Sequence, residues 1–343
     1  MRRSSFWGSA FSSVFLFLGL MTHAQAEDHF AGKTIIITTH SAPGGQYDAY
    51  CRVLARFYGK YIPGNPAIQV LNRVGAGGLL AVNNAMTAPR DGTLLTLVAN
   101  GLVLFQGIGM PGLRASLEEF NWIGNFNASN GVTVVMADAG VKTIEEARAR
   151  EIIIGSSGAG SISALLPAAH NAFAGTKFRV VQGYEGAAHM NLSMRRGEIQ
   201  GRSGAPWLEL QSDFPEESRS GRLVPLTQIG TVRDPMLPNV PLLTEIAVGD
   251  ARNLDAARFV SDSLTQTRAL AAPPGVPDDV VAILRTAFQK VLRDTEYVAQ
   301  VHQAGLELNP TTGEHVQATI QSVLKSPPSL REYVKTRLDP QKN

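Results

Sequence analysis

The pattern of apolar and polar positions predicts short buried strands that alternate with amphipathic helices along most of the chain. The β-branched run Thr34–Thr39 predicts the first strand, and apolar positions between Val53 and Tyr61 at helical spacing predict a helix after it. Further strands are predicted at residues 68–71 and 93–98, with a helix that ends near Ala88 between them. This order predicts a parallel α/β sheet.

The same alternation returns in the second half of the chain. A capping box at Thr143-Ile144-Glu145-Glu146 predicts a helix start. The other predicted elements are strands at 132–136, 152–154, 179–181, 198–200 and 268–272, and helices at 161–174, 242–246, 278–293, 295–304 and 313–324. We expect the C-terminal helices to pack against the α/β unit formed by the first part of the chain. The predicted lobes are residues 27–126 with 265–343, and residues 127–264.

Three glycine-rich loops follow predicted strands, at residues 42–48, 72–78 and 155–161. A loop that leads into a helix presents backbone N–H groups at the positive end of the helix dipole. Glycines let a ligand approach that backbone closely. The loops therefore predict a site for a small anion that does not depend on a buried lysine or arginine.

The N-terminal segment predicts a secretory signal peptide. Met1-Arg2-Arg3 supplies a basic start, residues 11–21 are almost wholly apolar, and Ala24-Gln25-Ala26 is a small-x-small cleavage signal. The apolar core is too short to span a bilayer comfortably. We therefore expect cleavage after Ala26 and an exported protein without direct membrane insertion.

Loss of the signal peptide removes the excess positive charge. Lys and Arg fall from 31 to 29, which equals the 29 Asp and Glu residues. A chain without net charge gives no sign of a nucleic-acid partner. Cys51, the one cysteine in the sequence, lies within a helical pattern and is predicted to be a buried, unreactive thiol.

The sequence contains no convincing catalytic or metal-binding motif. No lysine follows the glycines at 155–161, the spacing of a dinucleotide fingerprint is missing, and no G-x-S-x-G elbow includes Ser156, Ser157 or Ser203. The histidines form no H-E-x-x-H motif and no i,i+4 pair. These absences predict a protein that is not an enzyme and has no cofactor or metal.

Several residues keep two interpretations at this stage. Ser161 and Ser163 cap the helix that follows, or Ser156, Ser157 or Ser161 contacts a ligand, and the two roles can coexist. Asp48 either interacts favourably with a helix dipole or orients the first loop, and Asn100 is either a cap or a polar contact at the carboxyl edge of the sheet.

An ordered set of motifs resembles the Bug-type (TctC-like) binding proteins, the periplasmic receptors of tripartite tricarboxylate transporters. The motifs, which cover nearly all of the mature chain, are Pro43-Gly44-Gly45-x-x-Asp48, Asn72-Arg73-x-Gly75-Ala76-Gly77-Gly78, Asp91-Gly92-x-Leu94-Leu95, Gly158-x-Gly160-Ser161, Leu237-Pro238-Asn239-Val240-Pro241 and Ala271-Ala272-Pro273-Pro274-Gly275-Val276-Pro277.

The resemblance implies a type II periplasmic-binding-protein fold, in which two α/β lobes close like a Venus flytrap on a ligand in the cleft. It implies transport of a small organic carboxylate, aliphatic or aromatic, with membrane transporter subunits as partners and a monomeric receptor. The ligand-binding residues expected on this basis are Pro43, Gly44, Gly45, Gln46, Tyr47, Asp48, Asn100, Ser156, Ser157, Gly158, Ala159, Gly160, Ser161, Tyr184 and Arg202.

The chain also departs from the family pattern. Gln46 and Tyr47 stand where small residues are common, Glu185 replaces a lysine, and Arg202 follows a strand that usually carries an acidic pair. Arg202 is either a bidentate partner for a second ligand carboxylate or a surface residue. Two other functions stay open, namely an exported serine-dependent hydrolase and a sensor subunit for a signalling partner.

Overall fold

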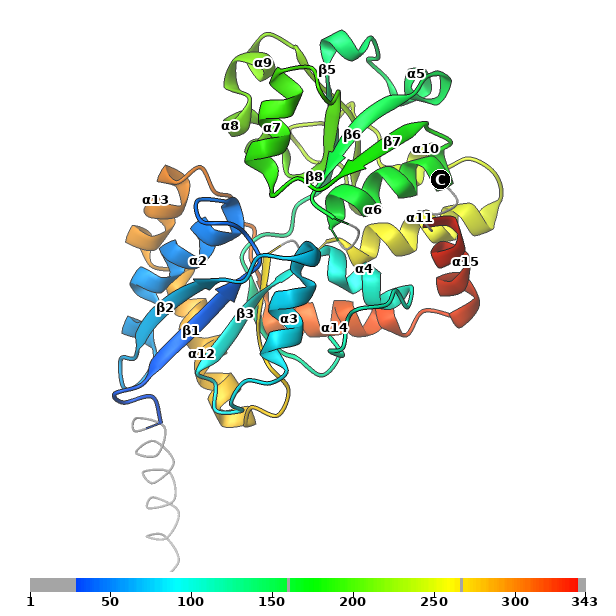
Figure 1. Cartoon of the computed structure of the whole chain (residues 1–343). Coiled ribbons are helices and arrows are strands. Elements are labelled where there is room, and N and C mark those ends of the chain that lie inside the picture. The colour runs from blue at the N-terminus through cyan, green and yellow to red at the C-terminus, as the bar shows by residue number, and fades with distance from the viewer. Residues whose placement is uncertain (1–28, 159–160, 266–267, 339–343) are drawn as a thin grey trace, which may run out of the picture.

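The computed structural model describes residues 29–158, 161–265 and 268–338, which form two α/β lobes (Figure 1). The predicted signal peptide lies outside the described residues. The sheet of the first lobe has the strand order β11-β4-β10-β3-β1-β2. Its strands are β1 (Thr34–Thr39), β2 (Ala67–Asn72), β3 (Leu94–Ala99), β4 (Asn121–Asn125), β10 (Arg268–Ala272) and β11 (Thr311–Thr312).

The prediction of a parallel sheet for the first three strands is confirmed, whereas the other strands of this lobe, for which no direction was predicted, are antiparallel. β1 pairs in parallel with both β2 and β3, because helices return the chain between them. β10 enters from the other lobe and pairs antiparallel with β3 and β4. The first sheet is therefore mixed, and its antiparallel half is built by segments far apart in the sequence.

Helices cover both faces of this sheet, and their buried faces form its core. They are α2 (Gln46–Phe57), α3 (Leu79–Ala85), α4 (Gly101–Gly107), α12 (Asp278–Val291), α13 (Thr295–Gln303) and α14 (Gly313–Leu324), with short 3-10 turns at Gly59–Tyr61 and Ala76–Gly78. Phe288 of α12 is fully buried, and its ring meets that of Phe126 edge-on at 4.9 Å. The C-terminal helices α12 and α14 pack on β4 of the first sheet, and α13 packs on α2.

Cys51 lies on the buried face of α2 and is fully buried, which confirms the sequence prediction. Burial raises the pKa of its thiol, so the reactive thiolate is disfavoured. We expect native protein to react with a maleimide at least about a thousandfold more slowly than protein unfolded in guanidinium, since labelling needs an opening of the core. Mass spectrometry of timed labelling reactions measures this ratio, and equal rates in both states would contradict the buried position.

The sheet of the second lobe has the strand order β7-β6-β8-β5-β9. Its strands are β5 (Gly131–Met136), β6 (Ile152–Ser156), β7 (Phe178–Gln182), β8 (Gly201–Ala205) and β9 (Leu223–Ile229). Around it lie α5 (Ile144–Ala149), α6 (Ile162–Ala169) with a π turn at His170–Ala174, α7 (Ala187–Arg195), α8 (Trp207–Asp213), α9 (Pro215–Arg219) and α10 (Leu243–Ile246), and 3-10 turn Ala137–Ala139 follows β5.

The strand predicted at residues 198–200 is wrong in position, because β8 covers Gly201–Ala205. This strand has small and polar residues in place of an apolar run, so periodicity does not reveal it. Gly201 is required for close packing, since a Cβ there would lie 2.3 Å from the Val134 carbonyl oxygen.

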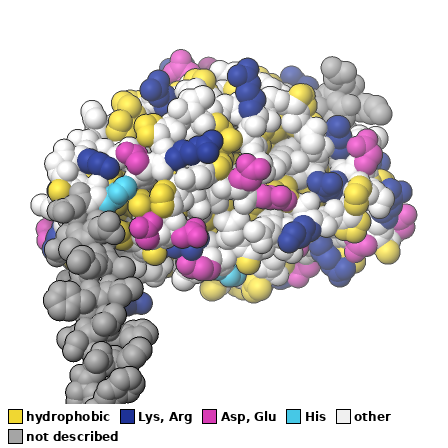
Figure 2. Space-filling model, turned by 90° about the horizontal axis from the view of Figure 1, so that it is seen from below, with side chains coloured by type: hydrophobic (Ala, Val, Ile, Leu, Met, Phe, Trp, Pro, Cys, Tyr) yellow, Lys and Arg dark blue, Asp and Glu magenta, His cyan; other side chains and the backbone are white. Residues whose placement is uncertain are grey.

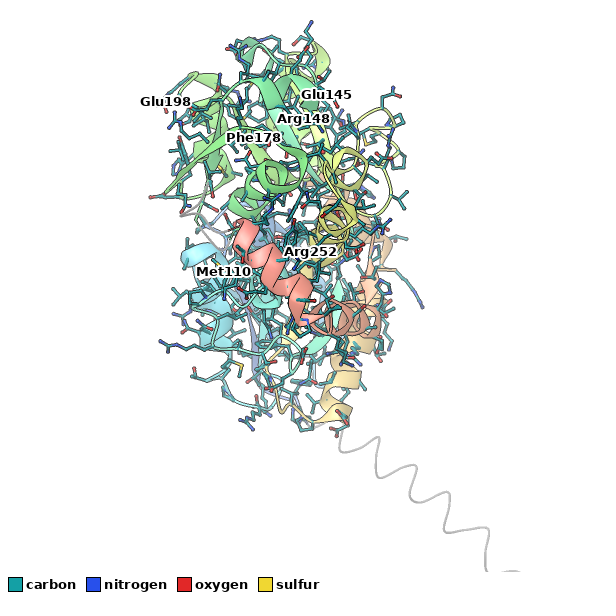
Figure 3. All side chains as sticks on the ribbon, turned by 90° about the vertical axis from the view of Figure 1, so that its right-hand side faces the viewer. Met110, Glu145, Arg148, Phe178, Glu198 and Arg252 are labelled. Atoms are coloured by element: carbon teal, nitrogen blue, oxygen red, sulfur yellow. The ribbon has the colours of Figure 1, made fainter. Side chains whose placement is uncertain are left out.

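Two further helices, α11 (Ala251–Ser263) and α15 (Pro328–Leu338), lie across the junction of the lobes. α15 packs against α6 and α11, and Figure 3 shows Met110 of the first lobe and Phe178 of the second near the same end of it. Arg252 of α11 lies over the Tyr333 ring of α15 at 4.2 Å. At this junction, one cluster of buried apolar side chains therefore includes residues of both lobes. The exact boundaries of the lobes stay a prediction.

The surface agrees with the balanced charge of the sequence. On the face shown in Figure 2, basic and acidic side chains are interspersed, and neither sign forms a continuous patch. In the part of the chain that the structure describes, no helix combines the length and apolar character needed to cross a bilayer.

Candidate ligand-binding cleft

A cavity of about 530 Å³ lies between the two lobes and is lined by both. The first lobe contributes residues 40–47, 74–78, 99–100 and Arg268. The second contributes Ser157, residues 161–163, 184–190, 202–205 and Glu209. All three glycine-rich loops of the sequence therefore reach the same cavity.

The N-terminal ends of three helices meet at this cavity. Gln46 and Tyr47 begin α2, Ile162 begins α6, and Ala187 begins α7. Among the described residues, the N-cap side chain of each of these three helices makes no capping hydrogen bond. Uncapped N–H groups and helix dipoles together favour an anion at this position.

Asp48 holds the first loop in place. Its carboxylate accepts hydrogen bonds from the Gly44 N–H at 2.8 Å, from Asn72 Nδ2 at 2.8 Å and from Arg52 Nε at 2.7 Å. Burial alone would raise the pKa of Asp48, but the bonds from Arg52, Gly44 and Asn72 outweigh it and keep the pKa below its usual value. The structure thus supports the interpretation that Asp48 orients the loop.

We expect Asp48→Ala to lower the free energy of unfolding by about 2 kcal/mol, because the Gly44 N–H and Asn72 lose a charged acceptor. Asp48→Asn should cost less, since the amide oxygen still accepts a hydrogen bond. Urea unfolding at pH 7 measures both variants. Asp255→Ala removes an exposed carboxylate paired with Arg258 and serves as control, with a change below about 0.5 kcal/mol. Equal losses at both positions would contradict the role of Asp48.

The third glycine-rich loop, at residues 155–161, is held by a cluster of serine hydroxyl groups. Ser161 Oγ donates to the Gly158 carbonyl at 2.6 Å and lies 2.8 Å from Ser163 Oγ. Ser163 Oγ accepts from the Ser157 N–H at 3.2 Å. Ser161 stands at the N-cap position of α6, but its side chain does not accept a helix N–H, so the capping interpretation is wrong for this side chain.

The serine cluster does not have the arrangement of an activated nucleophile. Within the described residues, the hydroxyls of Ser156, Ser157 and Ser161 bond to one another, to Ser163 and to the Gly158 backbone, and no histidine or carboxylate bonds to them. A general base within hydrogen-bond reach is the usual means of activating a serine. The described geometry therefore suits binding and gives a serine-dependent hydrolase no support.

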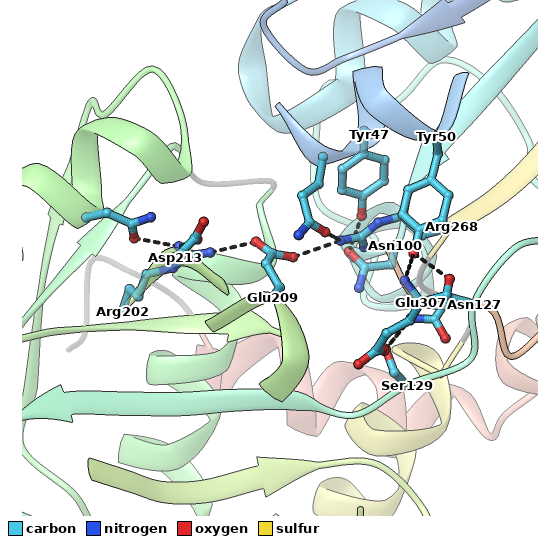
Figure 4. A network of polar contacts seen from close by, with 12 residues as sticks. Tyr47, Tyr50, Asn100, Asn127, Ser129, Arg202, Glu209, Asp213, Arg268 and Glu307 are labelled. Atoms are coloured by element: carbon cyan, nitrogen blue, oxygen red, sulfur yellow. Dashed lines mark hydrogen bonds and ion pairs between the residues drawn. The ribbon is translucent and has the colours of Figure 1, made fainter. Parts of the chain in front are cut away.

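Arg268 brings a buried positive charge to the first-lobe side of the cleft. Its guanidinium lies 4.0 Å from the centre of the Tyr47 ring, and its Nη2 donates to Glu209 of the other lobe at 3.2 Å (Figure 4). Glu209 in turn accepts from Arg202 Nη2 at 3.0 Å. Arg202 is buried, so the interpretation of it as a surface residue is wrong.

His40 is a cleft residue that the sequence analysis missed. Its ring meets Tyr47 at 4.3 Å, and burial, assisted by the charge of Arg268, lowers its pKa to about 4 although a hydrogen bond to the Leu97 backbone opposes this. His40 is therefore neutral at pH 7. Arg268 and Glu209 were also missed as site residues. An arginine at the start of the otherwise apolar strand β10 was the one available signal.

Most of the residues predicted from the sequence meet at the cavity. The lining set includes Pro43, Gly44, Gly45, Gln46, Tyr47, Asn100, Ser157, Ser161, Tyr184 and Arg202. Asp48, Ser156 and Gly158 are not among the lining residues, and Ala159 and Gly160 fall outside the described residues. Asn100 fulfils both of its interpretations, because its side chain accepts from the Gly101 N–H at 3.0 Å and from the Tyr47 hydroxyl at 3.3 Å.

Two α/β lobes around an anion-favouring cleft define a solute-binding protein of the periplasmic-binding-protein fold. Comparison with known proteins gives the family. The model of the tripartite tricarboxylate transporter family receptors matches residues 52–331, and the chain belongs to this family.

Individual relatives agree with this assignment. A protein encoded in the tcbD-tcbE intergenic region of Pseudomonas sp. strain P51 is 25% identical over 83% of this chain and 82% of its own. A TctC solute-binding protein from Polaromonas is 24% identical, with a TM-score of 0.63 over 90% of this chain and 98% of its own. MatC from Rhodopseudomonas palustris with bound malate is 19% identical, with a TM-score of 0.68 over 89% of this chain and all (100%) of its own.

Proposed function

We propose that this chain is a periplasmic receptor that binds a small organic carboxylate in the cleft and delivers it to a tripartite tricarboxylate-type membrane transporter. The observation that carries the proposal is the meeting of the uncapped helices α2, α6 and α7 at one cavity. The predicted signal peptide supports export. The malate bound in MatC supports an organic acid as the ligand class.

The proposed contacts follow from what each loop offers. Backbone N–H groups at Gln46 and Ala187 donate to the carboxylate, and the hydroxyl of Ser157 adds a donor from the third glycine-rich loop. Gly78 lets a ligand approach the backbone closely on the first-lobe side. A larger residue is excluded at this position, because φ is +101° and an added Cβ would lie only 2.7 Å from the Cβ of Ala99. Closure of the two lobes about the strands that join them then shields the ligand from water.

A thermal-shift screen of residues 27–343 against aliphatic and aromatic mono-, di- and tricarboxylates tests the proposal. A ligand at a hundred times its dissociation constant adds about 2.7 kcal/mol of stability. Binding should be lost when Ser157 and Ser161 are both replaced by bulky residues. If verified ligand-free protein shows no shift with any of these acids, the proposal is wrong, and turnover of activated esters becomes the next assay.

A further inference from the structure

Glu209 places one of the protein's own carboxylates inside the cleft, between two arginines from different lobes. Its Oε2 accepts from Arg268 Nη2 at 3.2 Å, and its Oε1 accepts from Arg202 Nη2 at 3.0 Å (Figure 4). The side chains of Arg268, Glu209 and Arg202 are 5%, 7% and 5% exposed. Buried charge-assisted hydrogen bonds of this kind are among the stronger polar contacts in proteins.

The charges of this cluster balance. Arg202 also donates from Nη1 to Asp213 at 3.0 Å and to the side-chain oxygen of Asn191 at 2.6 Å. The two guanidinium groups therefore face two carboxylates, Glu209 and Asp213. Arginine stays protonated at all relevant pH values, so a second ligand carboxylate meets a cluster that is already neutral.

Arg268 also contacts the end of the first glycine-rich loop, at Gln46 and Tyr47. Its Nη2 lies 3.4 Å from the Gln46 side-chain oxygen, and its guanidinium covers the Tyr47 ring. Both residues stand at the N-terminal end of α2, where the proposed ligand carboxylate binds. A ligand that carries a second carboxylate at its other end would meet Arg268 with Glu209 already bound to it.

We propose that Glu209 is a specificity-determining residue, whose carboxylate takes the place at Arg268 that a second ligand carboxylate would otherwise take. The cleft then selects monocarboxylates over dicarboxylates of the same carbon skeleton. Entry of a second carboxylate either displaces Glu209 from Arg268 and leaves it buried with Arg202 as its one remaining cation of the pair, or brings two negative charges together at Arg268, and both are costly. This inference rests on the proposed carboxylate-binding function.

Isothermal titration with matched pairs of acids tests the selectivity of the natural chain. The pairs are 2-hydroxybutyrate and malate, hexanoate and adipate, and 4-methylbenzoate and terephthalate, in each of which a methyl group stands in place of the second carboxylate. We expect the monocarboxylate of any pair that binds to bind at least about tenfold more tightly. Equal affinities, or preference for the dicarboxylate, would overturn the proposal without affecting the proposed function. Absence of binding by all six acids would count against both.

The variant Glu209→Gln keeps the shape of the side chain and removes its charge. It should raise the affinity for the matched dicarboxylate by about 10- to 100-fold, because one arginine charge is then available to the ligand. The double variant with Arg268→Met should lose this gain. Glu216→Gln, an exposed change of equal charge on α9, is the control and should leave the selectivity unchanged.

The variants also separate selectivity from folding. Circular dichroism and the melting temperature establish whether Glu209→Gln folds, and the comparison of acids with the natural chain stands by itself if it does not. A folded Glu209→Gln protein that still rejects dicarboxylates would overturn the proposal. So would a gain of the same size in the Glu216→Gln control, since that result would reflect overall charge.

Discussion

Acidification from pH 7 to pH 4.5 should lower the free energy of unfolding by about 3 kcal/mol, mainly because His170 must stay neutral in the folded protein. This residue is fully buried, its Nδ1 lies 2.8 Å from the Leu166 carbonyl oxygen, and burial lowers its pKa to about 4. His40 has a similarly lowered pKa but is partly exposed at the cleft wall, so water reduces its contribution to the loss of unfolding free energy.

The sign follows from proton binding. An unfolded histidine titrates near pH 6.5, whereas folded His170 titrates near pH 4, so the unfolded chain binds more protons between these values. The stabilisation is complete above pH 6.5 and is lost as the pH falls towards 4. Glu307 and Asp262 act in the opposite direction, since burial raises the pKa of each carboxyl group.

Urea unfolding at half-unit steps from pH 7 to pH 4.5 measures the effect. The variant His170→Gln should have a clearly smaller pH dependence than the natural chain. His302→Gln changes an exposed histidine on α13 and should leave the pH dependence as it was. A free energy of unfolding that stays constant over this range, or an unchanged slope in His170→Gln, would contradict a neutral buried His170.

The sequence predicted those parts of the fold whose physical causes are local. The strand Thr34–Thr39 is a β-branched run, and α14 matches its predicted bounds, Gly313–Leu324, because a polar start and helical apolar spacing fix both ends. Strand β8 was misplaced because its stability comes from packing of small residues, which periodicity does not register. The antiparallel direction of β10 could not be predicted from the sequence either, since this direction depends on the path of the chain between the lobes.

The residues of the candidate site also divide into those that the sequence predicts and those that it does not. The glycine loops were recognisable because close backbone approach requires glycine itself, and the structure brings all three to one cavity. The ion pairs that join Arg268, Glu209 and Arg202 were missed, because their partners lie 59 and 7 residues apart and on different lobes or elements. Charged side chains that come together only in the folded protein have no regular spacing in the sequence from which their contact could be predicted.

The second large effect is expected from Gly186→Asp, which should weaken carboxylate binding by about 100- to 1000-fold without unfolding the protein. Gly186 is the N-cap of α7, its backbone is extended, and a Cβ added there meets no atom within 4 Å. An aspartate fits this position and caps the helix, which favours stability. Its charge would stand about 5 Å from the bound carboxylate, a repulsion of about 3 kcal/mol at an effective dielectric constant of about 20.

Gly186→Asn separates charge from capping. Asparagine caps α7 as well as aspartate does, so both variants use the same N–H donors and should have melting temperatures at or slightly above that of the natural chain. Without the negative charge, Gly186→Asn should weaken binding by no more than about tenfold. Titration of all three proteins with the tightest acid from the screen gives the comparison. Equal affinities in the two variants would mean that the start of α7 does not face the ligand's negative charge, and the cleft's preference for anions would then rest on α2 and α6 alone.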